Sequence, residues 1–230
     1  CKGNGHLRCL NELPSLKLLE INKCPDLTDR YASPLMNLKL ERLIWGVKEL
    51  TKRDVGLLNA SEAEISLIYY SPSSMNDLCM GMFSEIERLR ELTFVDFGDS
   101  AFPAGVTSLT HLTQLTFKGG RLAASEADNG ASAMEWGYLP DHVVSLELAC
   151  KMDRAVTRNL LLSGSHITNL VLHADCISAM PELERCSNLR TLKLFAKELT
   201  GEFFANLEFM NNLETLHFGG CPDLTGNDFN

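Results

Sequence analysis

The sequence lacks the short motifs that mark common enzyme classes. Its 230 residues contain no P-loop, no G-x-S-x-G nucleophile turn, no H-E-x-x-H zinc helix and no G-x-G-x-x-G dinucleotide loop. No two cysteines have the close C-x-x-C spacing of a zinc or redox site. We therefore expect a chain that is not an enzyme, with no catalytic residues, no cofactor and no metal.

Positive charge and long apolar runs are also scarce. Lysine and arginine total 21 against 30 acidic residues, which gives a net charge of −9. Binding to nucleic acid generally needs a basic surface, so we expect no nucleic-acid partner. No segment approaches the roughly 18 apolar residues of a membrane-spanning helix, so we expect no membrane span.

The cysteines are scattered along the chain rather than clustered. Eight are present: Cys1, Cys9, Cys24, Cys79, Cys150, Cys176, Cys186 and Cys221. Scattered cysteines in a chain of this size usually act as small buried apolar residues. We expect reduced thiols and a cytoplasmic location.

The sequence does contain a repeated pattern, L-x-x-L-x-L, which returns about every 24 residues. It can be written nine times: Leu16/Leu19/Ile21, Leu40/Leu43/Trp45, Glu64/Leu67/Tyr69, Leu89/Leu92/Phe94, Leu112/Leu115/Phe117, Val143/Leu146/Leu148, Ile167/Leu170/Leu172, Leu189/Leu192/Leu194 and Leu213/Leu216/Phe218. The third copy is the weakest, because a charge occupies its first position and its register could be shifted by two residues.

This pattern has a direct physical interpretation. The fourth and sixth positions alternate along a short strand, so both side chains point to one face. A single repeat cannot bury them, whereas stacked repeats can pair their strands about 4.8 Å apart and merge the apolar groups into one core. The period and the triplets resemble leucine-rich repeat proteins. That resemblance implies an α/β solenoid with parallel strands on the concave face and short helices and turns on the convex face.

Two repeats carry a further signature immediately after their strands. The phrases Cys24-Pro25-Asp26-Leu27-Thr28 and Cys221-Pro222-Asp223-Leu224-Thr225 occupy equivalent positions. A cysteine there resembles the repeats of F-box proteins and of plant intracellular immune receptors, and the segment from Leu13 to Leu27 is more similar to the receptors. The equivalent positions of the other repeats hold neither cysteine nor asparagine.

The domain organisation follows from the register. We expect one repeat domain over residues 1–230 with about nine repeats. Cys1 fits the position after a strand that is missing, and the last repeat stops at Asn230 with its return segment incomplete, so we expect a fragment of a longer chain. The widest interval between repeats, 31 residues, contains residues 121–137 with Trp136, which we interpret as an inserted loop that either contacts a partner or folds back onto the core.

The segments between strands are predicted to be mixed. Residues 74–89 have helical spacing of apolar residues, with Asp77 three positions after a capping Ser74. Residues 153–162 and 201–210 also favour helix, whereas residues 99–108 contain Pro103 and Gly105 and do not. Gly119-Gly120 and Gly219-Gly220 are expected to form tight turns after strands.

The residues that alternate with the buried triplets should form the exposed strand face. Directly after the strand core lie Asn22, Gly46, Tyr70, Val95, Lys118, Ala149, His173, Phe195 and Gly219, and between the last two apolar positions lie Glu20, Ile44, Ile68, Thr93, Thr116, Glu147, Val171, Lys193 and His217. Exposed aromatic, apolar and basic groups on such a surface are typical of protein binding. Our candidate protein-binding residues are Tyr70, Val95, Lys118, His173, Lys193, Phe195 and His217; the alternative is that they pack on one another or on a flanking domain.

A polar cluster in the sequence needs separate consideration. His166, His173, Asp175 and Cys176 are close together, but a metal site needs three or four ligands that converge. Asp175 and Cys176 are expected in a turn and His173 in a strand, so we interpret the cluster as ordinary surface.

The sequence thus predicts a non-catalytic protein-protein interaction scaffold. The leading hypothesis, from the resemblance, is the ligand-sensing or autoinhibitory repeat region of a larger intracellular, immune-type receptor, whose partner lies on the concave face or is a flanking domain of the parent chain. The alternatives are a substrate-recruiting arm of a ubiquitin-ligase adaptor and a structural subunit of a large assembly.

Overall fold

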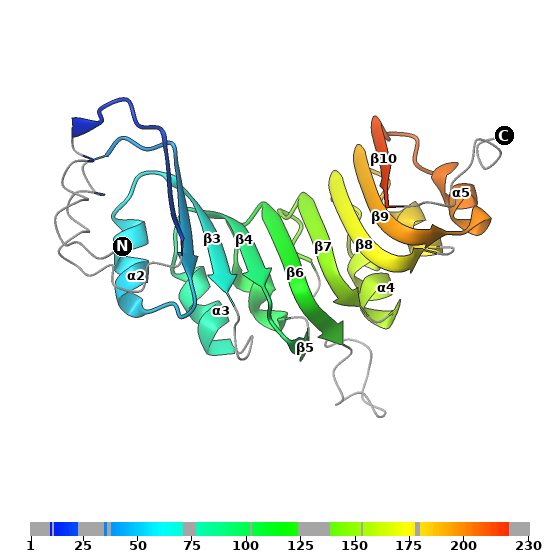
Figure 1. The fold of residues 1–230 in the computed structure, drawn as a ribbon, viewed down its shortest axis with the longest axis horizontal. Helices are drawn as coiled ribbons and strands as arrows, with labels where there is room; N and C mark the ends of the chain where they lie inside the picture. Colours follow the sequence, from blue (N-terminus) through cyan, green and yellow to red (C-terminus); the bar gives the residue numbers. More distant parts are fainter. Residues whose placement is uncertain are drawn as a thin grey trace.

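The computed structural model is a curved sheet of side-by-side strands with helices along its outer side (Figure 1). It describes residues 10, 12–22, 35, 38–70, 77–101, 103–123, 139–152, 154–177 and 180–220. The strands are β1 (Leu18–Asn22), β2 (Arg42–Val47), β3 (Glu64–Tyr70), β4 (Leu89–Val95), β5 (Asp99–Ala101), β6 (Gln114–Ala123), β7 (Ser145–Met152), β8 (Asn169–Ile177), β9 (Thr191–Leu199) and β10 (Thr215–Gly219).

The strands follow one another in chain order. The sheet runs β1-β2-β3-β4-β6-β7-β8-β9-β10, every pair is parallel, and the short β5 pairs with β6. Parallel neighbours need a connection that crosses back after each strand. Those connections carry the helices, so the strands line the concave side of the curve as predicted (Figure 1).

The predicted triplets form the core. From the second repeat to the eighth, every triplet residue except Glu64 is buried. Leu192, in β9, has an exposed fraction of 0%, whereas Leu216, its partner in the β10 ladder, is 38% exposed. The difference arises because β10 pairs on one side only within the described sheet.

Strand β3 changes the register of the sheet. Toward β2 its Leu67 pairs with Trp45, but toward β4 the same residue pairs with Leu92. A register irregularity between Ile65 and Ser66 accompanies the change. Relative to β3, the residues of β1 and β2 therefore pair two positions away from the alignment that the nine triplets predict. This resolves the register of the third repeat, which the sequence left ambiguous.

Helices and 3₁₀ turns return the chain between strands. They are α2 (Lys52–Asn59), α3 (Asp77–Ser84), η3 (Ala104–Ser108), α4 (Arg154–Leu162), η5 (Pro181–Arg185) and α5 (Gly201–Leu207). The predictions for 153–162 and 201–210 are confirmed as α4 and α5, and α3 lies within the predicted 74–89, although Ser74 is outside the described residues. The segment 99–108 was expected to be free of helix and instead holds η3, because Pro103 can precede a 3₁₀ turn.

Helix α2 was not predicted, although its N-terminus has a local signature. Thr51 is the N-cap; the Asp54 amide donates to its Oγ1 at 3.2 Å, and the Thr51 amide donates to the Asp54 carboxylate at 2.9 Å. This reciprocal pair satisfies two helix-end donors that would otherwise lack partners. The T-x-x-D spacing was the available signal.

Asparagine side chains connect successive repeats at a position that the sequence reading did not consider. The amide of Asn188 donates to the Ser165 carbonyl, and the amide of Asn212 donates to the Ser187 carbonyl, each at 2.8 Å. Both asparagines directly precede the first leucine of a triplet. They satisfy backbone acceptors of the preceding repeat that would otherwise need water.

Two cysteines have described side chains, and both are buried and free. Burial raises the pKa of Cys150 to about 12 and that of Cys186 to about 11. Both thiols therefore stay protonated at neutral pH, where the thiolate needed for reaction is scarce. The two Cys-Pro-Asp-Leu-Thr phrases lie outside the described residues.

The predicted loop at 121–137 lies mostly outside the described residues. Residues 121–123 are the end of β6, and the remaining positions, Trp136 included, lie outside the described residues. Gly119 and Gly120 also belong to β6 rather than to a turn after it. Both have φ of +69°, and the register with β7 shifts between Lys118 and Arg121, so these glycines form an irregularity inside the strand.

Candidate functional site

The sheet presents three rows of side chains on its outward face, which is the side opposite the buried triplets. Burial alternates along the strands, as in β7 and β9. The first row is Glu20, Ile44, Ser66, Glu91, Gln114, Ser145, Asn169, Thr191 and Thr215; the second is Asn22, Gly46, Ile68, Thr93, Thr116, Glu147, Val171, Lys193 and His217. The predicted alignment of Glu20 and Ile44 with Ile68 is wrong, because the register change at β3 places them beside Ser66.

The seven candidate binding residues all lie on this outward face. In the third row Tyr70, Val95 and Lys118 are consecutive on β3, β4 and β6, and His173 and Phe195 are consecutive on β8 and β9. Lys193 and His217 are neighbours in the second row. Lys118, Lys193 and His217 are exposed, and the other four are partly exposed.

The candidates on the last three strands form one ring cluster. The His173 ring stacks on Phe195 with centroids 4.4 Å apart and an interplanar angle of 19°. The Phe195 ring also contacts His217 with centroids 5.5 Å apart. The predicted alternative, that these residues pack on one another, is therefore seen in the structure, and the packing holds Phe195 in a defined orientation on the face.

A glycine makes room for the phenylalanine. Gly219 is the ladder partner of Phe195, and a Cβ at Gly219 would lie 2.5 Å from the Phe195 ring. Real Cβ atoms do not approach other atoms so closely, so a larger residue would displace the ring. A glycine also lies beside a ring in the first half of the sheet, where a Cβ on Gly46 would lie 2.9 Å from the ring of Tyr70.

An ion pair lies beside the ring cluster, on β6 and β7. Lys118 Nζ is 3.4 Å from Glu147 Oε1, and the side chain of Glu147 is 25% exposed. Both charges affect the pKa of His173. Burial lowers the pKa of His173 below its ordinary value, with Glu147 opposing that shift and Lys118 adding to it. At neutral pH the ring is therefore mainly neutral and able to stack.

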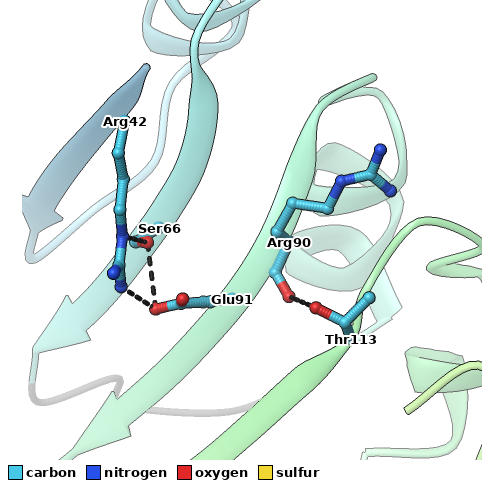
Figure 2. A network of polar contacts seen from close by, with 5 residues as sticks. All are labelled: Arg42, Ser66, Arg90, Glu91 and Thr113. Atoms are coloured by element: carbon cyan, nitrogen blue, oxygen red, sulfur yellow. Dashed lines mark hydrogen bonds and ion pairs between the residues drawn. The ribbon is translucent and has the colours of Figure 1, made fainter. Parts of the chain in front are cut away.

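The first strands of the sheet carry a polar network, which Figure 2 shows. Arg42 Nε donates to Ser66 Oγ at 2.9 Å, Ser66 Oγ donates to Glu91 Oε2 at 3.0 Å, and the Arg42 guanidinium forms an ion pair with Glu91. The network spans β2, β3 and β4. The sequence reading missed it because the displaced register of β3 is what brings Arg42 and Glu91 to either side of Ser66.

The strand-end contacts nearby are made by Arg90. Thr113 Oγ1 donates to the Arg90 carbonyl at 3.1 Å (Figure 2), and the Arg90 guanidinium donates to the His111 carbonyl at 3.1 Å and lies 3.9 Å from a Glu64 oxygen. These contacts link β3, β4 and the segment before β6. They fix the edge of the outward face at the start of the strands.

The two histidines of the polar cluster have different surroundings. His173 is in the ring cluster, whereas His166 lies before β8 with its Nδ1 3.6 Å from Asp141. Asp175 and Cys176 were expected in a turn, but their backbone continues β8 to Ile177. Among the residues whose side chains are described, no group of three or more histidine, cysteine, aspartate or glutamate side chains could hold a metal ion.

Comparison with known proteins adds a structural result. No family model and no curated protein matches the chain. Among solved structures, an internalin of Listeria monocytogenes superposes with a TM-score of 0.54 at 17% identity, over 96% of this chain and 59% of the internalin chain. The fold is a leucine-rich repeat solenoid.

Two other solved structures are less similar. A leucine-rich repeat protein of Leptospira interrogans has a TM-score of 0.48 at 14% identity, over 99% of this chain and 61% of its own. TLR13 in a complex with ssRNA13 has a TM-score of 0.46 at 17% identity, over 83% of this chain and 27% of its own. This chain thus spans less than two thirds of each of these three chains. Within its described residues, no helix has the length and apolar character that crossing a membrane requires.

Proposed function

We propose that this leucine-rich repeat chain is a non-catalytic protein-binding scaffold that binds through the outward face of its sheet. The observation that supports this most is the ring cluster of His173, Phe195 and His217, which holds a partly exposed phenylalanine in one orientation. Aromatic groups that are already ordered lose little conformational entropy on binding, and they commonly contribute most to the affinity of protein interfaces.

We further propose that the scaffold is the ligand-sensing or autoinhibitory repeat region of a larger, cytoplasmic, immune-type receptor. The Cys-Pro-Asp-Leu-Thr phrases at Cys24 and Cys221 support this from the sequence. In such a receptor, flanking domains of the parent chain occupy the face in the resting state. The same phrases favour one alternative, the substrate-recruiting arm of a ubiquitin-ligase adaptor, and a structural subunit of a large assembly is a third.

Site-specific photo-cross-linking in the full parent chain tests these proposals. A photoreactive amino acid replaces Lys193, which is exposed on β9, and in a matched control it replaces Lys52, which is exposed on α2 at the outer side of the curve. We expect cross-links to protein from position 193 and few from position 52. A flanking domain as the product supports autoinhibition, a separate protein supports ligand sensing, and ubiquitin-ligase subunits favour the adaptor. Cross-links from position 52 with none from position 193 would overturn the binding face.

A further inference from the structure

The charge of the outward face changes sign along the sheet. On β6 to β10 its outward positions carry Lys118, Arg121, Lys151, Lys193 and Lys197, whereas Glu147 is the one carboxylate there whose side chain the structure describes. Arg190 and Glu214, which precede β9 and β10, neutralise each other at 3.1 Å. Among the described side chains, this half of the face is therefore basic in a chain whose net charge is −9.

Two of these cations have no carboxylate partner among the described side chains. Lys193 and Lys151 are both exposed, and neither forms an ion pair within the described chain. Lys193 lies in the ladder between Val171 and His217, and it is two residues before Phe195 on β9, so both side chains are on the outward face. An unpaired ammonium group thus lies next to an ordered ring.

The combination indicates the chemistry of a partner. We infer that the outward face of β6 to β10 binds an extended acidic peptide segment of a partner protein, with carboxylates on Lys193 and Lys151 and one aromatic or aliphatic side chain against Phe195. We name this surface the basic ring patch: Lys118, Lys151, His173, Lys193, Phe195 and His217. This inference rests on the proposed protein-binding function and adds the chemical class of the partner.

The dimensions of the patch set the length of that segment. Four interstrand spacings separate β6 from β10, roughly 19 Å at about 4.8 Å each. An extended chain advances about 3.3 Å per residue, so about six residues cross the patch. Complementary charge would guide the encounter and fix the register, while the ring contact would supply desolvated apolar area.

Replacing Glu147 should change the affinity for an acidic peptide in the opposite direction to replacing a lysine of the patch. Because its carboxylate lies 3.4 Å from Lys118 Nζ, it neutralises a cation that the peptide could otherwise use. Glu147→Gln should therefore tighten binding of an acidic peptide, whereas Lys193→Gln should weaken it. A role in folding alone would not produce opposite effects on affinity.

The experiment uses fluorescence anisotropy with three labelled probes. The first is an eight-residue peptide of glutamates and aspartates with one central phenylalanine, the second is the same peptide with glutamine and asparagine, and the third is oligouridylate of eight nucleotides. We expect the acidic peptide to bind at least tenfold more tightly than its amide counterpart. Lys193→Gln and Lys151→Gln should each weaken it about twofold to fivefold, and Phe195→Ala about tenfold.

Matched controls separate the patch from general effects. Lys52→Gln on α2 should leave the affinity unchanged, and every variant should keep the parental circular dichroism spectrum. Equal binding of the two peptides, or no acidic-peptide binding at 1 mM, would overturn the inference. Tighter binding of oligouridylate than of the acidic peptide would overturn it as well. If position 193 cross-links to a partner segment that is not acidic, the inference fails while the proposed function stands.

Discussion

The two halves of the sheet have the same core and different outward faces. On β1 to β4 the outward charges are Glu20, Glu64 and Glu91 with Arg42, and the last two are joined through Ser66. On β6 to β10 lysines predominate and rings stack across strands. The inward positions of both halves are mainly buried apolar residues.

This contrast shows how the two sides of one strand are separated in function. Successive side chains point to opposite faces, so an outward residue can change without altering the packing of its inward neighbours. The inward side of each strand determines that repeats stack. The outward side can therefore differ between the halves, with side chains that bond to one another on β2 to β4 and exposed basic side chains on β6 to β10.

The largest expected effect tests whether the cores of the two halves are equivalent. Leu92 on β4 and Leu192 on β9 occupy the same triplet position, and both have an exposed fraction of 0%. Leu92→Ala and Leu192→Ala should each lower the free energy of unfolding by about 2 to 5 kcal/mol, because each leaves a cavity. Urea denaturation measures this. Leu216→Ala, at 38% exposure, should cost clearly less, and a harmless Leu192→Ala would show that the β9 register is wrong.

The second prediction concerns the glycines that each half places beside an outward ring. Gly46→Ala and Gly219→Ala should each destabilise the fold by about 1 to 3 kcal/mol through overpacking. Gly46→Ala should have the larger effect, because its Cβ would lie 3.1 Å from the Asn22 backbone, whereas the Phe195 ring beside Gly219 can rotate away.

Gly56→Ala is the matched control for these two variants. A Cβ at this position in α2 meets nothing within 4 Å, and alanine favours helix over glycine by about 1 kcal/mol. Thermal denaturation should therefore show an unchanged or slightly raised Tm. Equal stability of all three variants would mean that neither outward glycine is sterically required.

The third prediction compares the ion pairs of the two faces by double-mutant cycles. Arg42 and Glu91 share Ser66 as a common partner, and the Glu91 side chain is 26% exposed, so their coupling should reach about 1 kcal/mol. Lys118 and Glu147, at 3.4 Å and with half of the lysine exposed, should couple by less than about 0.5 kcal/mol. The test depends on which of the two coupling energies is larger, not on the value of either. A stronger Lys118–Glu147 coupling would mean that this pair is not available to a partner.

The sequence predicted the inward half of this architecture well and the outward half only in part. Apolar residues every 24 positions leave few arrangements other than stacked strands, so the triplets and the face of Phe195 could be derived. The Arg42–Ser66–Glu91 network could not, because it depends on a two-residue register change at β3 that the triplet of Glu64 leaves ambiguous. Ring stacking of His173 on Phe195 depends equally on side-chain orientation, which periodicity does not specify.

The smallest expected effect is a pH dependence confined to the second half. The described outward positions of β1 to β4 hold no histidine, whereas His173 lies in the ring cluster with Glu147 and Lys118 facing it. Burial lowers the pKa of His173 in the folded state, so the unfolded chain takes up the proton first as the pH falls below about 6.5. His173 therefore contributes its full stability above that pH, and this contribution is lost as the pH falls toward the folded-state pKa.

Urea denaturation at pH 7.5 and 5.5 should show a smaller loss of unfolding free energy for His173→Gln than for the parent. Because His166 has a pKa lowered by burial too, the parent and the variant should both lose some stability, and an identical loss in the two would exclude titration of the ring cluster.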